Sequence, residues 1–388
     1  MRKQLLFTIL MLLPLVASAH DIEVANVDCV TIYYNYTNNG TELAVTSGDT
    51  QYTGNVVIPE VVTYENNTYK VTSIGTFAFF CCTNLTSIEI PNSVTSIGQG
   101  AFSGCTNLTS IEIPNSVTSI SSDIFYNTAW YNNQPDGLVY AGNVAYCYKG
   151  TMPSNTSLTI KEGTTAIASN AFSGCSGLTS ITIPNSVTSI DYQTFYNCNK
   201  LTSINIPNSV TSIGQKAFYD CSGLSSVTIG NSVKSIGGDA FFGCTNLTSI
   251  NIPNSVKSID YQAFYNCYAL TSVTIGNSVT SIGTRVFYGC YRLNRIEVLA
   301  IEPPYIENES KDYPTFGQTI NGQNEVYQYA YVYIPKGTYE AYSSAYGWKN
   351  FKNIKTIDVA ENIPQDVNGD GVVDTQDVLE IYKYIQEH

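Results

Sequence analysis

A repeat of constant length constrains this 388-residue chain more than any other feature of its sequence. A phenylalanine recurs every 23 residues in two runs, and the two runs lie 47 residues apart, which is two periods plus one residue. These phenylalanines are Phe79, Phe102 and Phe125, then Phe172, Phe195, Phe218, Phe241, Phe264 and Phe287. Such a period indicates a solenoid, because one repeat cannot bury its own apolar face and stacked neighbours form a continuous core.

Within each repeat, the apolar residues occupy the same columns. In the repeat at 91–113 they are Val94, Ile97, Ala101, Phe102, Cys105, Leu108, Ile111 and Ile113. The last three predict a short strand with Ile111 and Ile113 facing inward and Ser110 and Glu112 facing outward, because strand side chains alternate. Pro-Asn-Ser then supplies a turn. About nine repeats therefore predict a leucine-rich-repeat solenoid with a curved parallel sheet and short helical or irregular return segments.

This unit resembles the BspA-like subgroup of leucine-rich repeats over residues 71–298, and the segment 333–339 with Trp348 is similar to the closing segment of that family. The resemblance implies surface-exposed or secreted proteins that adhere to host proteins or to other cells. We accordingly predict an N-terminal cap at 20–70, repeats at 71–298 with an insertion at about 129–155, and a C-terminal cap at 299–360.

The first nineteen residues predict export. Arg2 and Lys3 precede an apolar run, and Ala17-Ser18-Ala19 forms a small-residue cleavage site, so residues 1–19 are expected to be a signal peptide. No later apolar stretch is long enough for a membrane span. The net charge is −13, or −15 without Arg2 and Lys3, which makes nucleic acid an unsuitable partner. We expect a secreted, extracellular or cell-surface protein.

Eight of the eleven cysteines share one repeat column. They are Cys82, Cys105, Cys175, Cys198, Cys221, Cys244, Cys267 and Cys290. A ladder of disulfides, a string of metal ions and a buried column of small apolar residues are the alternatives. Stacked side chains point in parallel, which suits disulfide geometry poorly, and neither histidines nor CxxC pairs accompany the column. We favour free core thiols.

Histidine content argues against an enzyme. The two histidines, His20 and His388, lie at the ends of the predicted mature chain, which excludes a Ser-His-Asp or Cys-His arrangement inside the fold. Glu89 and Glu112 occupy successive outward positions and could form a carboxylate pair, as in glycosidases. Their column continues mainly through threonine and asparagine, so we interpret it as a polar surface and predict a non-catalytic protein.

Aromatic residues mark two candidate ligand-binding regions. A tyrosine or phenylalanine often follows the core phenylalanine directly, and its ring and hydroxyl suit protein or glycan partners. The insertion adds aromatic runs around Ala141-Gly142-Asn143 that predict a hairpin. The candidate residues are Tyr126, Tyr196, Tyr219, Tyr265, Tyr288, Trp130 and Tyr131. In both regions the alternative is that the rings only stabilise the stacking of adjacent coils.

The acidic segment 361–388 carries a calcium-loop pattern. Oxygen side chains stand at loop positions 1, 3, 5, 9 and 12 with a glycine at position 6, as in an EF-hand, and a backbone carbonyl is expected at position 7. The predicted calcium ligands are Asp366, Asn368, Asp370, Val372, Asp374 and Asp377. The loop and the helix expected after it resemble a single dockerin repeat. That resemblance implies a cohesin-like scaffold as a partner and, as an alternative function, a non-catalytic part of a polysaccharide-degrading assembly.

Overall fold

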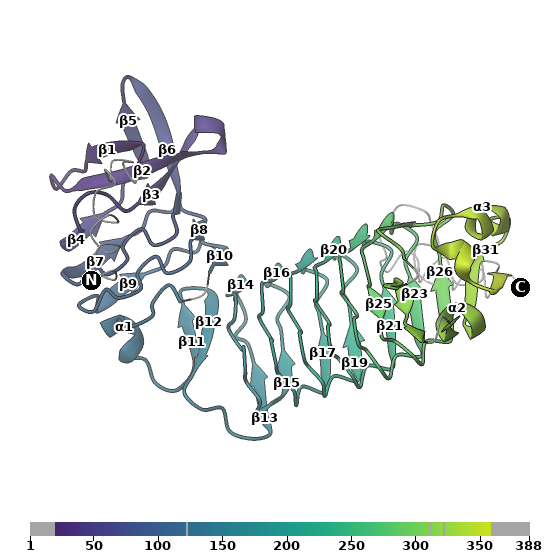
Figure 1. The fold of residues 1–388 in the computed structure, drawn as a ribbon. Coiled ribbons are helices and arrows are strands. Elements are labelled where there is room, and N and C mark those ends of the chain that lie inside the picture. Colours follow the sequence, from purple (N-terminus) through teal and green to yellow (C-terminus); the bar gives the residue numbers. More distant parts are fainter. Residues whose placement is uncertain (1–19, 122, 311, 321–322, 358–388) are drawn as a thin grey trace, which may run out of the picture. The chain divides into compact units, whose positions relative to one another are not determined.

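A computed structural model describes residues 20–357 apart from 122, 311 and 321–322 (Figure 1). The predicted signal peptide 1–19 and the predicted calcium segment 361–388 lie outside the described residues. The chain forms two compact units. The first unit contains residues up to Thr151 together with Thr164–Ala171, and the second contains Met152–Gly163 together with the residues from Phe172 onward.

The first unit begins with strands that are mostly antiparallel. β1 pairs with β2, β2 with β3 and β5 with β6 in antiparallel fashion, whereas β3 and β6 run parallel. The bounds are β1 (Ile22–Ala25), β2 (Thr31–Thr37), η1 (Asn38–Gly40), β3 (Glu42–Thr46), β5 (Val61–Tyr64) and β6 (Asn67–Ile74).

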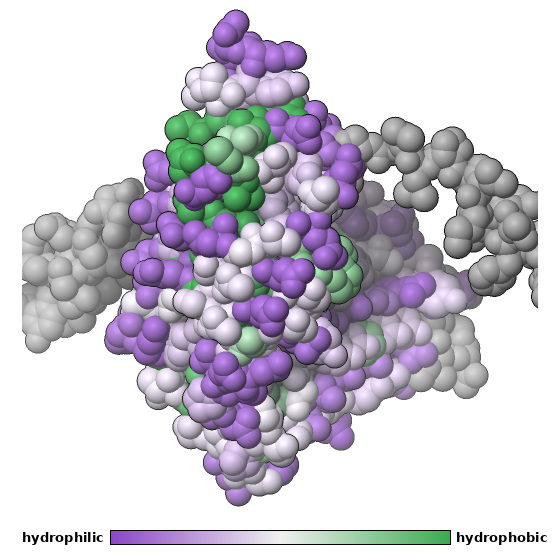
Figure 2. Space-filling model, turned by 90° about the vertical axis from the view of Figure 1, so that its left-hand side faces the viewer, coloured by the Kyte–Doolittle hydropathy of each residue, from purple (hydrophilic) through white to green (hydrophobic). Residues whose placement is uncertain are grey.

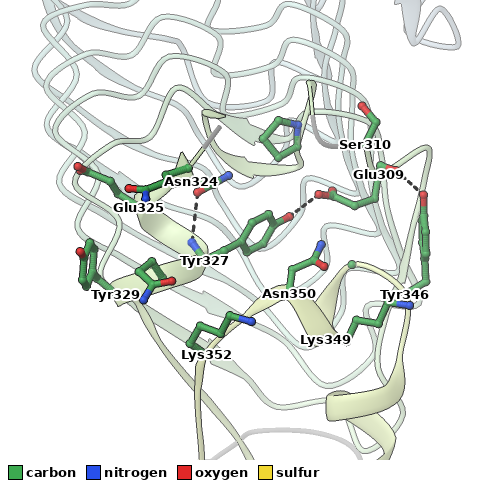
Figure 3. A pocket seen from close by; sticks show the side chains of 14 residues that line it. Glu309, Ser310, Asn324, Glu325, Tyr327, Tyr329, Tyr346, Lys349, Asn350 and Lys352 are labelled. Atoms are coloured by element: carbon green, nitrogen blue, oxygen red, sulfur yellow. Dashed lines mark hydrogen bonds between the residues drawn. The ribbon is translucent and has the colours of Figure 1, made fainter. Parts of the chain in front are cut away.

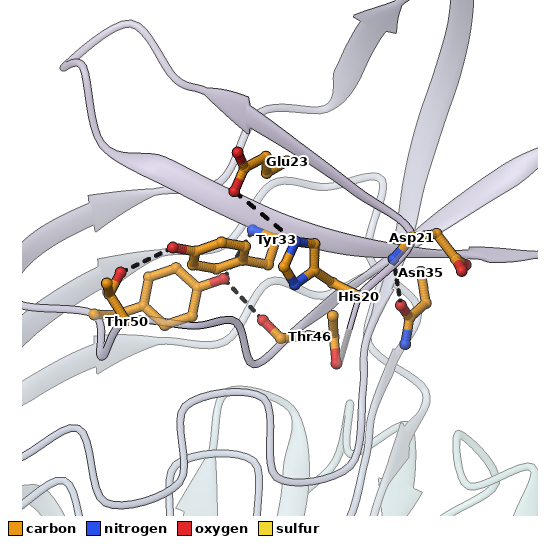
Figure 4. Close-up of polar contacts among 8 residues, drawn as sticks. His20, Asp21, Glu23, Tyr33, Asn35, Thr46 and Thr50 are labelled. Carbon is orange, nitrogen blue, oxygen red and sulfur yellow. Dashed lines mark hydrogen bonds and ion pairs between the residues drawn. The ribbon is translucent and has the colours of Figure 1, made fainter. Parts of the chain in front are cut away.

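Polar contacts fasten the beginning of this sheet (Figure 4). The His20 ring lies 4.6 Å from the Tyr33 ring, and its Nε2 is 3.8 Å from the Glu23 carboxylate. Tyr52 accepts the Tyr33 backbone N–H at 3.0 Å and donates its hydroxyl to the Thr46 carbonyl at 2.8 Å. The Tyr33 hydroxyl lies 2.8 Å from the Thr50 hydroxyl. Buried phenols need such partners, so these bonds allow Tyr33 and Tyr52 to join the core.

Two parallel ladders then build the coils of the first unit. One consists of β4, β7 and β9, and the other continues from β6 through β8 to β10. An insertion follows, in which β11 and β12 form an antiparallel hairpin and β12 pairs parallel with β14. The bounds are β4 (Gly54–Val57), β7 (Leu85–Glu89), β8 (Ser96–Ile97), β9 (Ser110–Glu112), β10 (Ser119–Ile120), α1 (Ala129–Asn132), β11 (Gly137–Ala141), β12 (Val144–Lys149) and β14 (Ala166–Ile167).

The second unit repeats this two-ladder plan. On one side, the parallel pairs are β13 with β15, β17 with β19, and the run β21-β23-β26-β31-β32. These strands are β13 (Thr156–Thr159), β15 (Leu178–Thr182), β17 (Ser203–Asn205), β19 (Ser226–Thr228), β21 (Ser249–Ile252), β23 (Ser272–Ile275), β26 (Arg295–Val298), β31 (Tyr331–Pro335) and β32 (Asn353–Ile357). The parallel ladder thus continues beyond residue 298 into the predicted C-terminal cap.

Short Ser-Ile strands form the other ladder. They are β16 (Ser189–Ile190), β18 (Ser212–Ile213), β20 (Ser235–Ile236), β22 (Ser258–Ile259) and β24 (Ser281–Ile282), followed by β27 (Tyr305–Ile306). The remaining elements are β25 (Phe287–Tyr288), β28 (Phe316–Gly317), β29 (Thr319–Ile320), β30 (Gln323–Asn324), α2 (Glu325–Tyr329), α3 (Tyr339–Ser344) and η2 (Trp348–Asn350). The return segments of these repeats therefore consist of two-residue strands and turns.

The core follows the predicted columns. The phenylalanines from Phe172 to Phe287 are fully buried, and neighbouring rings stack with centroids 5.0–5.4 Å apart. In β17, Ile204 is buried while Ser203 and Asn205 are exposed, as the alternation predicts. The predicted parallel solenoid with its 23-residue spacing is confirmed.

The cysteine column lies inside this core, and none of the eleven cysteines forms a disulfide in the structure. Six thiols of the column donate to a core phenylalanine carbonyl of the preceding coil at 2.9–3.3 Å, as Cys244 does to Phe218. Burial raises the pKa of Cys105 and of Cys221 to about 12. The thiol hydrogen bond gives each of these six buried sulfurs a partner within the coil stack.

Candidate binding surface along the tyrosine ladder

Five aromatic rings stack into a continuous ladder in the second unit. The rings of Tyr196, Tyr219, Phe242, Tyr265 and Tyr288 have successive centroid distances of 5.1, 4.5, 4.8 and 4.9 Å, with interplanar angles between 3° and 16°. We call these five residues the tyrosine ladder. Its spacing matches the separation of about 4.8 Å between neighbouring parallel strands, so the coils themselves set the pitch.

Turn geometry places each ladder ring on the surface. In the Tyr219 repeat, the Tyr219 N–H donates to the Lys216 carbonyl at 3.2 Å, closing a turn around the buried Phe218. The Phe218 N–H meanwhile donates to Ala240 of the next coil at 2.7 Å. Phe218 is therefore held in the core, and the residue that follows it is turned toward the outside.

The ladder rings cover each other's faces. Each inner ring stacks on both neighbours, and all five are partly buried, so a ligand reaches ring edges and hydroxyls rather than open faces. Desolvation raises the pKa of Tyr219 and of Tyr265, which keeps these phenols neutral hydrogen-bonding groups. The ladder thus offers a row of hydroxyl groups at a regular pitch, interrupted at Phe242.

Four more exposed tyrosines lie in the same repeats. Tyr192, Tyr261, Tyr268 and Tyr291 are 43, 38, 42 and 45 % exposed. Tyr268 and Tyr291 stack at 5.7 Å, and the Tyr261 hydroxyl is hydrogen-bonded to the Gln215 amide. The Tyr261 ring also packs against the backbone at Gly238, where an added Cβ would lie 2.4 Å from it. These flanking tyrosines present more open ring surface than the ladder does.

Tyr126 belongs to the first unit and lies outside the ladder. Its ring is 65 % exposed, and it lines a small pocket of about 100 Å³ together with Tyr131, Tyr146 and Cys147. Burial raises the pKa of Tyr131 to about 12 and that of Cys147 to about 11. A space of this size holds only a few waters. Of the five candidate tyrosines that directly follow a core phenylalanine, the structure therefore brings four together in the ladder and leaves Tyr126 apart.

The insertion takes the place of a coil. The Tyr146 ring lies 5.2 Å from Phe125 at the end of the phenylalanine column, and its hydroxyl accepts the Phe125 N–H at 3.2 Å. The Trp130 ring packs on Phe125 at 4.3 Å, while its backbone N–H donates to Leu108 at 2.7 Å. The hairpin agrees with the sequence prediction, and the contacts of Trp130 and Tyr146 give it a structural role.

The side of the first unit that Figure 2 shows is mostly polar. In Figure 2, hydrophilic and intermediate residues cover most of the visible face, and a hydrophobic area lies near its upper part. Glu89 and Glu112 are direct partners in the register of β7 and β9. Among the residues that the structure describes, no three His, Cys, Asp or Glu side chains gather in a group that could hold a metal ion.

No helix within the described ranges has the length and apolar character needed to cross a bilayer, and α3 has only six residues.

The 23-residue repeat, the two ladders of parallel strands and the phenylalanine column define a leucine-rich-repeat solenoid. Comparison with protein families agrees: the BspA type leucine-rich repeat region matches in six copies over residues 61–134, 144–242 and 211–310. This is more than half of the chain, so the chain belongs to the BspA type leucine-rich repeat family. A comparison with curated proteins finds no match.

Solved structures include similar repeat proteins. A leucine-rich repeat protein from Bacteroides ovatus is 27 % identical, with a TM-score of 0.29, over 69 % of this chain and 93 % of the other. A leucine-rich cell surface protein from Faecalibacterium prausnitzii is 25 % identical, with a TM-score of 0.29, over 87 % of this chain and 95 % of the other.

Proposed function

We propose that this chain is a secreted or cell-surface, non-catalytic binding protein that holds a protein or glycan partner along the tyrosine ladder and its flanking tyrosines. Membership of the repeat family supports a binding role, since stacked repeats provide extended surfaces. The observation that carries the proposal is the continuous ladder of five rings together with four exposed tyrosines in the same repeats.

The ladder geometry suggests a test that separates binding from stability. Phe242 shows that phenylalanine stacks in this column as well as tyrosine does. Replacing Tyr196, Tyr219, Tyr265 and Tyr288 together by Phe keeps the rings and removes the hydroxyls. We expect this variant to remain folded and to lose most of its binding in an array of glycans and extracellular-matrix proteins.

A second variant tests the flanking rings. Tyr192→Ser with Tyr261→Ser removes exposed aromatic surface, and Tyr305→Ser with Tyr339→Ser is the matched control, since Tyr305 and Tyr339 are exposed but lie outside both sets. Binding should fall in the first pair and persist in the control pair. Unchanged binding in both the Phe variant and the flanking variant would refute the proposal that this surface binds the partner. Unfolding of the Phe variant would show that the tyrosine hydroxyls stabilise the fold instead.

The alternative function rests on the calcium-loop spacing at 366–377, which lies outside the described residues. In that case, the segment 361–388 docks a non-catalytic protein onto a cohesin-like scaffold of a polysaccharide-degrading assembly. A pull-down with the full chain distinguishes the two proposals. Loss of the partner in Asp366→Ala plus Asp370→Ala supports docking, and loss in the ladder variant supports the repeat surface.

A further inference from the structure

The C-terminal part of the second unit forms a pocket of about 620 Å³, which the repeat pattern does not account for (Figure 3). Its walls come from the segment around Glu309, from α2 and from the residues around η2. This volume lies within the range typical of small-molecule sites. The pocket is separate from the tyrosine ladder, because no ladder residue lines it.

Hydrogen bonds fix the inner wall of this pocket. The Tyr327 hydroxyl donates to the Glu309 carboxylate at 2.6 Å, and the Thr315 N–H donates to the same carboxylate at 2.7 Å. Asn324 accepts the Tyr327 N–H at 3.2 Å and donates its amide to the Phe316 carbonyl at 2.7 Å. Figure 3 shows Tyr327 directed at Glu309 across the site.

The core supports this wall from behind. Phe316 stacks on Phe287 at 5.2 Å and so extends the phenylalanine column. The Tyr327 ring packs edge-on against Phe351 at 4.7 Å and against Phe316 at 6.4 Å. A polar wall held by the end of a rigid column is preorganised, which reduces the entropy lost when a ligand binds.

Two tyrosines and two lysines of the pocket are exposed to a ligand. Tyr329 and Tyr346 are 68 and 51 % exposed, and the Tyr346 hydroxyl donates to the Glu309 backbone carbonyl, which leaves its ring as the group that a ligand can contact. Lys349 and Lys352 form no ion pair with any residue that the structure describes. In Figure 3, Lys352 and Asn350 extend toward Tyr327 from the side opposite Asn324. The site therefore combines aromatic rings with donors and amides in a confined space.

The balance of charges indicates a neutral ligand. Among the lining residues that the structure describes, two lysines are matched by two carboxylates, Glu309 and Glu325, so these residues carry no excess of either sign. The described part of the lining contains no leucine, isoleucine, valine or methionine, which makes a purely apolar ligand a poor fit. Hydroxyl groups both donate and accept hydrogen bonds, and the C–H face of a sugar ring packs on tyrosine.

We propose that this pocket binds a neutral sugar, either alone or as a pyranose residue of a glycan. Tyr329 and Tyr346 pack against the sugar ring, while the amides and lysines bond its hydroxyls. The inner wall of Tyr327 and Glu309 sets the depth of the site. This assignment is independent of the ladder, since a protein partner on the ladder leaves the sugar site intact.

Ligand-observed NMR and titration calorimetry on the full chain test the proposal. The probes are galactose, mannose, N-acetylglucosamine and short neutral oligosaccharides, with glucuronate and inorganic phosphate as charged probes. We expect at least one neutral sugar to bind, and Tyr329→Ala to weaken it about tenfold through loss of the ring contact. Tyr329→Phe should restore most of that binding.

Controls separate the pocket from general effects. Tyr339→Ala removes a tyrosine that is 52 % exposed and lies outside the pocket, so sugar binding should be unchanged. The quadruple Phe variant of the ladder should also bind the sugar normally. Absence of binding by every neutral probe, tighter binding of glucuronate or phosphate, or equal losses in Tyr329→Ala and Tyr339→Ala would each overturn the assignment.

Discussion

At the residue scale, the repeats depend on two columns of positive φ. One contains Gly243 and its equivalents, which are glycine, asparagine or aspartate in the second unit, types that tolerate this region. The other contains Gln193, Lys216, Asp239 and Gln262, with φ between 53° and 58°. Each of these four N–H groups donates to the next coil at 2.9–3.1 Å, so hydrogen bonds between coils offset the backbone strain.

Gly243→Ala should destabilise the second unit. Its φ is +70°, which strains any residue with a Cβ, and an added Cβ would lie 2.2 Å from Asp220 Oδ1, so the Asp220 side chain would also have to shift. We expect a loss of about 1–2 kcal/mol in thermal or urea unfolding. Lys216→Gly, at φ 58°, is the control and should lose no stability because glycine adopts this conformation freely. Equal losses in both variants would contradict the argument.

The cysteine column should resist modification in the native protein. Cys221 and Cys244 are fully buried and their sulfurs donate to carbonyls, whereas Cys29 is exposed. Brief treatment with iodoacetamide at pH 8 should therefore label Cys29 and leave the column unlabelled until denaturant is added. Mass spectrometry under non-reducing conditions checks this result. Disulfides between repeats would contradict the free-thiol interpretation.

Alkaline pH should destabilise the repeats through the same thiols. Burial raises the pKa of Cys221 from 9.0 to about 12, so the folded state keeps the proton that the unfolded state releases. Its contribution is fully present below pH 9 and is lost as the pH rises from 9 to 12, by about 1.4 kcal/mol per pH unit for each such thiol. Urea midpoints measured at pH 7, 9 and 10 should fall above pH 9, and Cys221→Ala should reduce that dependence.

At the element scale, the phenylalanine column provides the main packing between coils. Phe218 is fully buried between Phe195 and Phe241, with centroid distances of 5.1 and 5.0 Å. Phe218→Ala should therefore cost about 3–5 kcal/mol of unfolding free energy. Phe80→Ala, at a ring that is 50 % exposed, should cost clearly less. Calorimetric unfolding of both variants measures the difference, and similar losses would argue against the column as the main packing element.

The sequence predicts elements that bury alternate side chains and misses those that do not. The alternation around Ile204 predicts β17, whereas a two-residue strand such as β18, with Ile213 as its one buried side chain, gives no period to detect. The insertion predicts a hairpin from its turn residues. The insertion can replace a coil because Tyr146 packs on Phe125 where the phenylalanine of the next repeat would lie. Tyr146 does not fall on the 23-residue spacing of the phenylalanines, so the repeat pattern does not predict this contact.

The candidate surface was predictable only in part, for a similar reason. The 23-residue spacing predicts that Tyr196, Tyr219, Tyr265 and Tyr288 lie on one side of the solenoid. The stacking that covers their ring faces depends on how each turn orients the ring, which the spacing does not show. Tyr126 occupies the same column and yet stays apart, because the residue one period earlier is Ser103 and the insertion follows it. The sugar pocket lies outside the repeat columns, so periodicity carries no signal for it.

At the scale of the whole molecule, the acidic segment 361–388 differs in chemistry from the repeats. Its loop at 366–377 offers oxygen groups at EF-hand spacing, and calcium prefers such hard donors. The expected result is heat from calcium binding to the full chain in isothermal titration, and none in Asp366→Ala plus Asp370→Ala. Asp28→Ala plus Asp49→Ala removes two exposed carboxylates from the first unit and serves as the charge-matched control, which should bind like the wild type. Calcium binding that survives in the loop variant would place the ion elsewhere, and the proposed docking function would then lose its basis. The proposals for the tyrosine ladder and for the sugar pocket do not depend on this result, because their own variants test them.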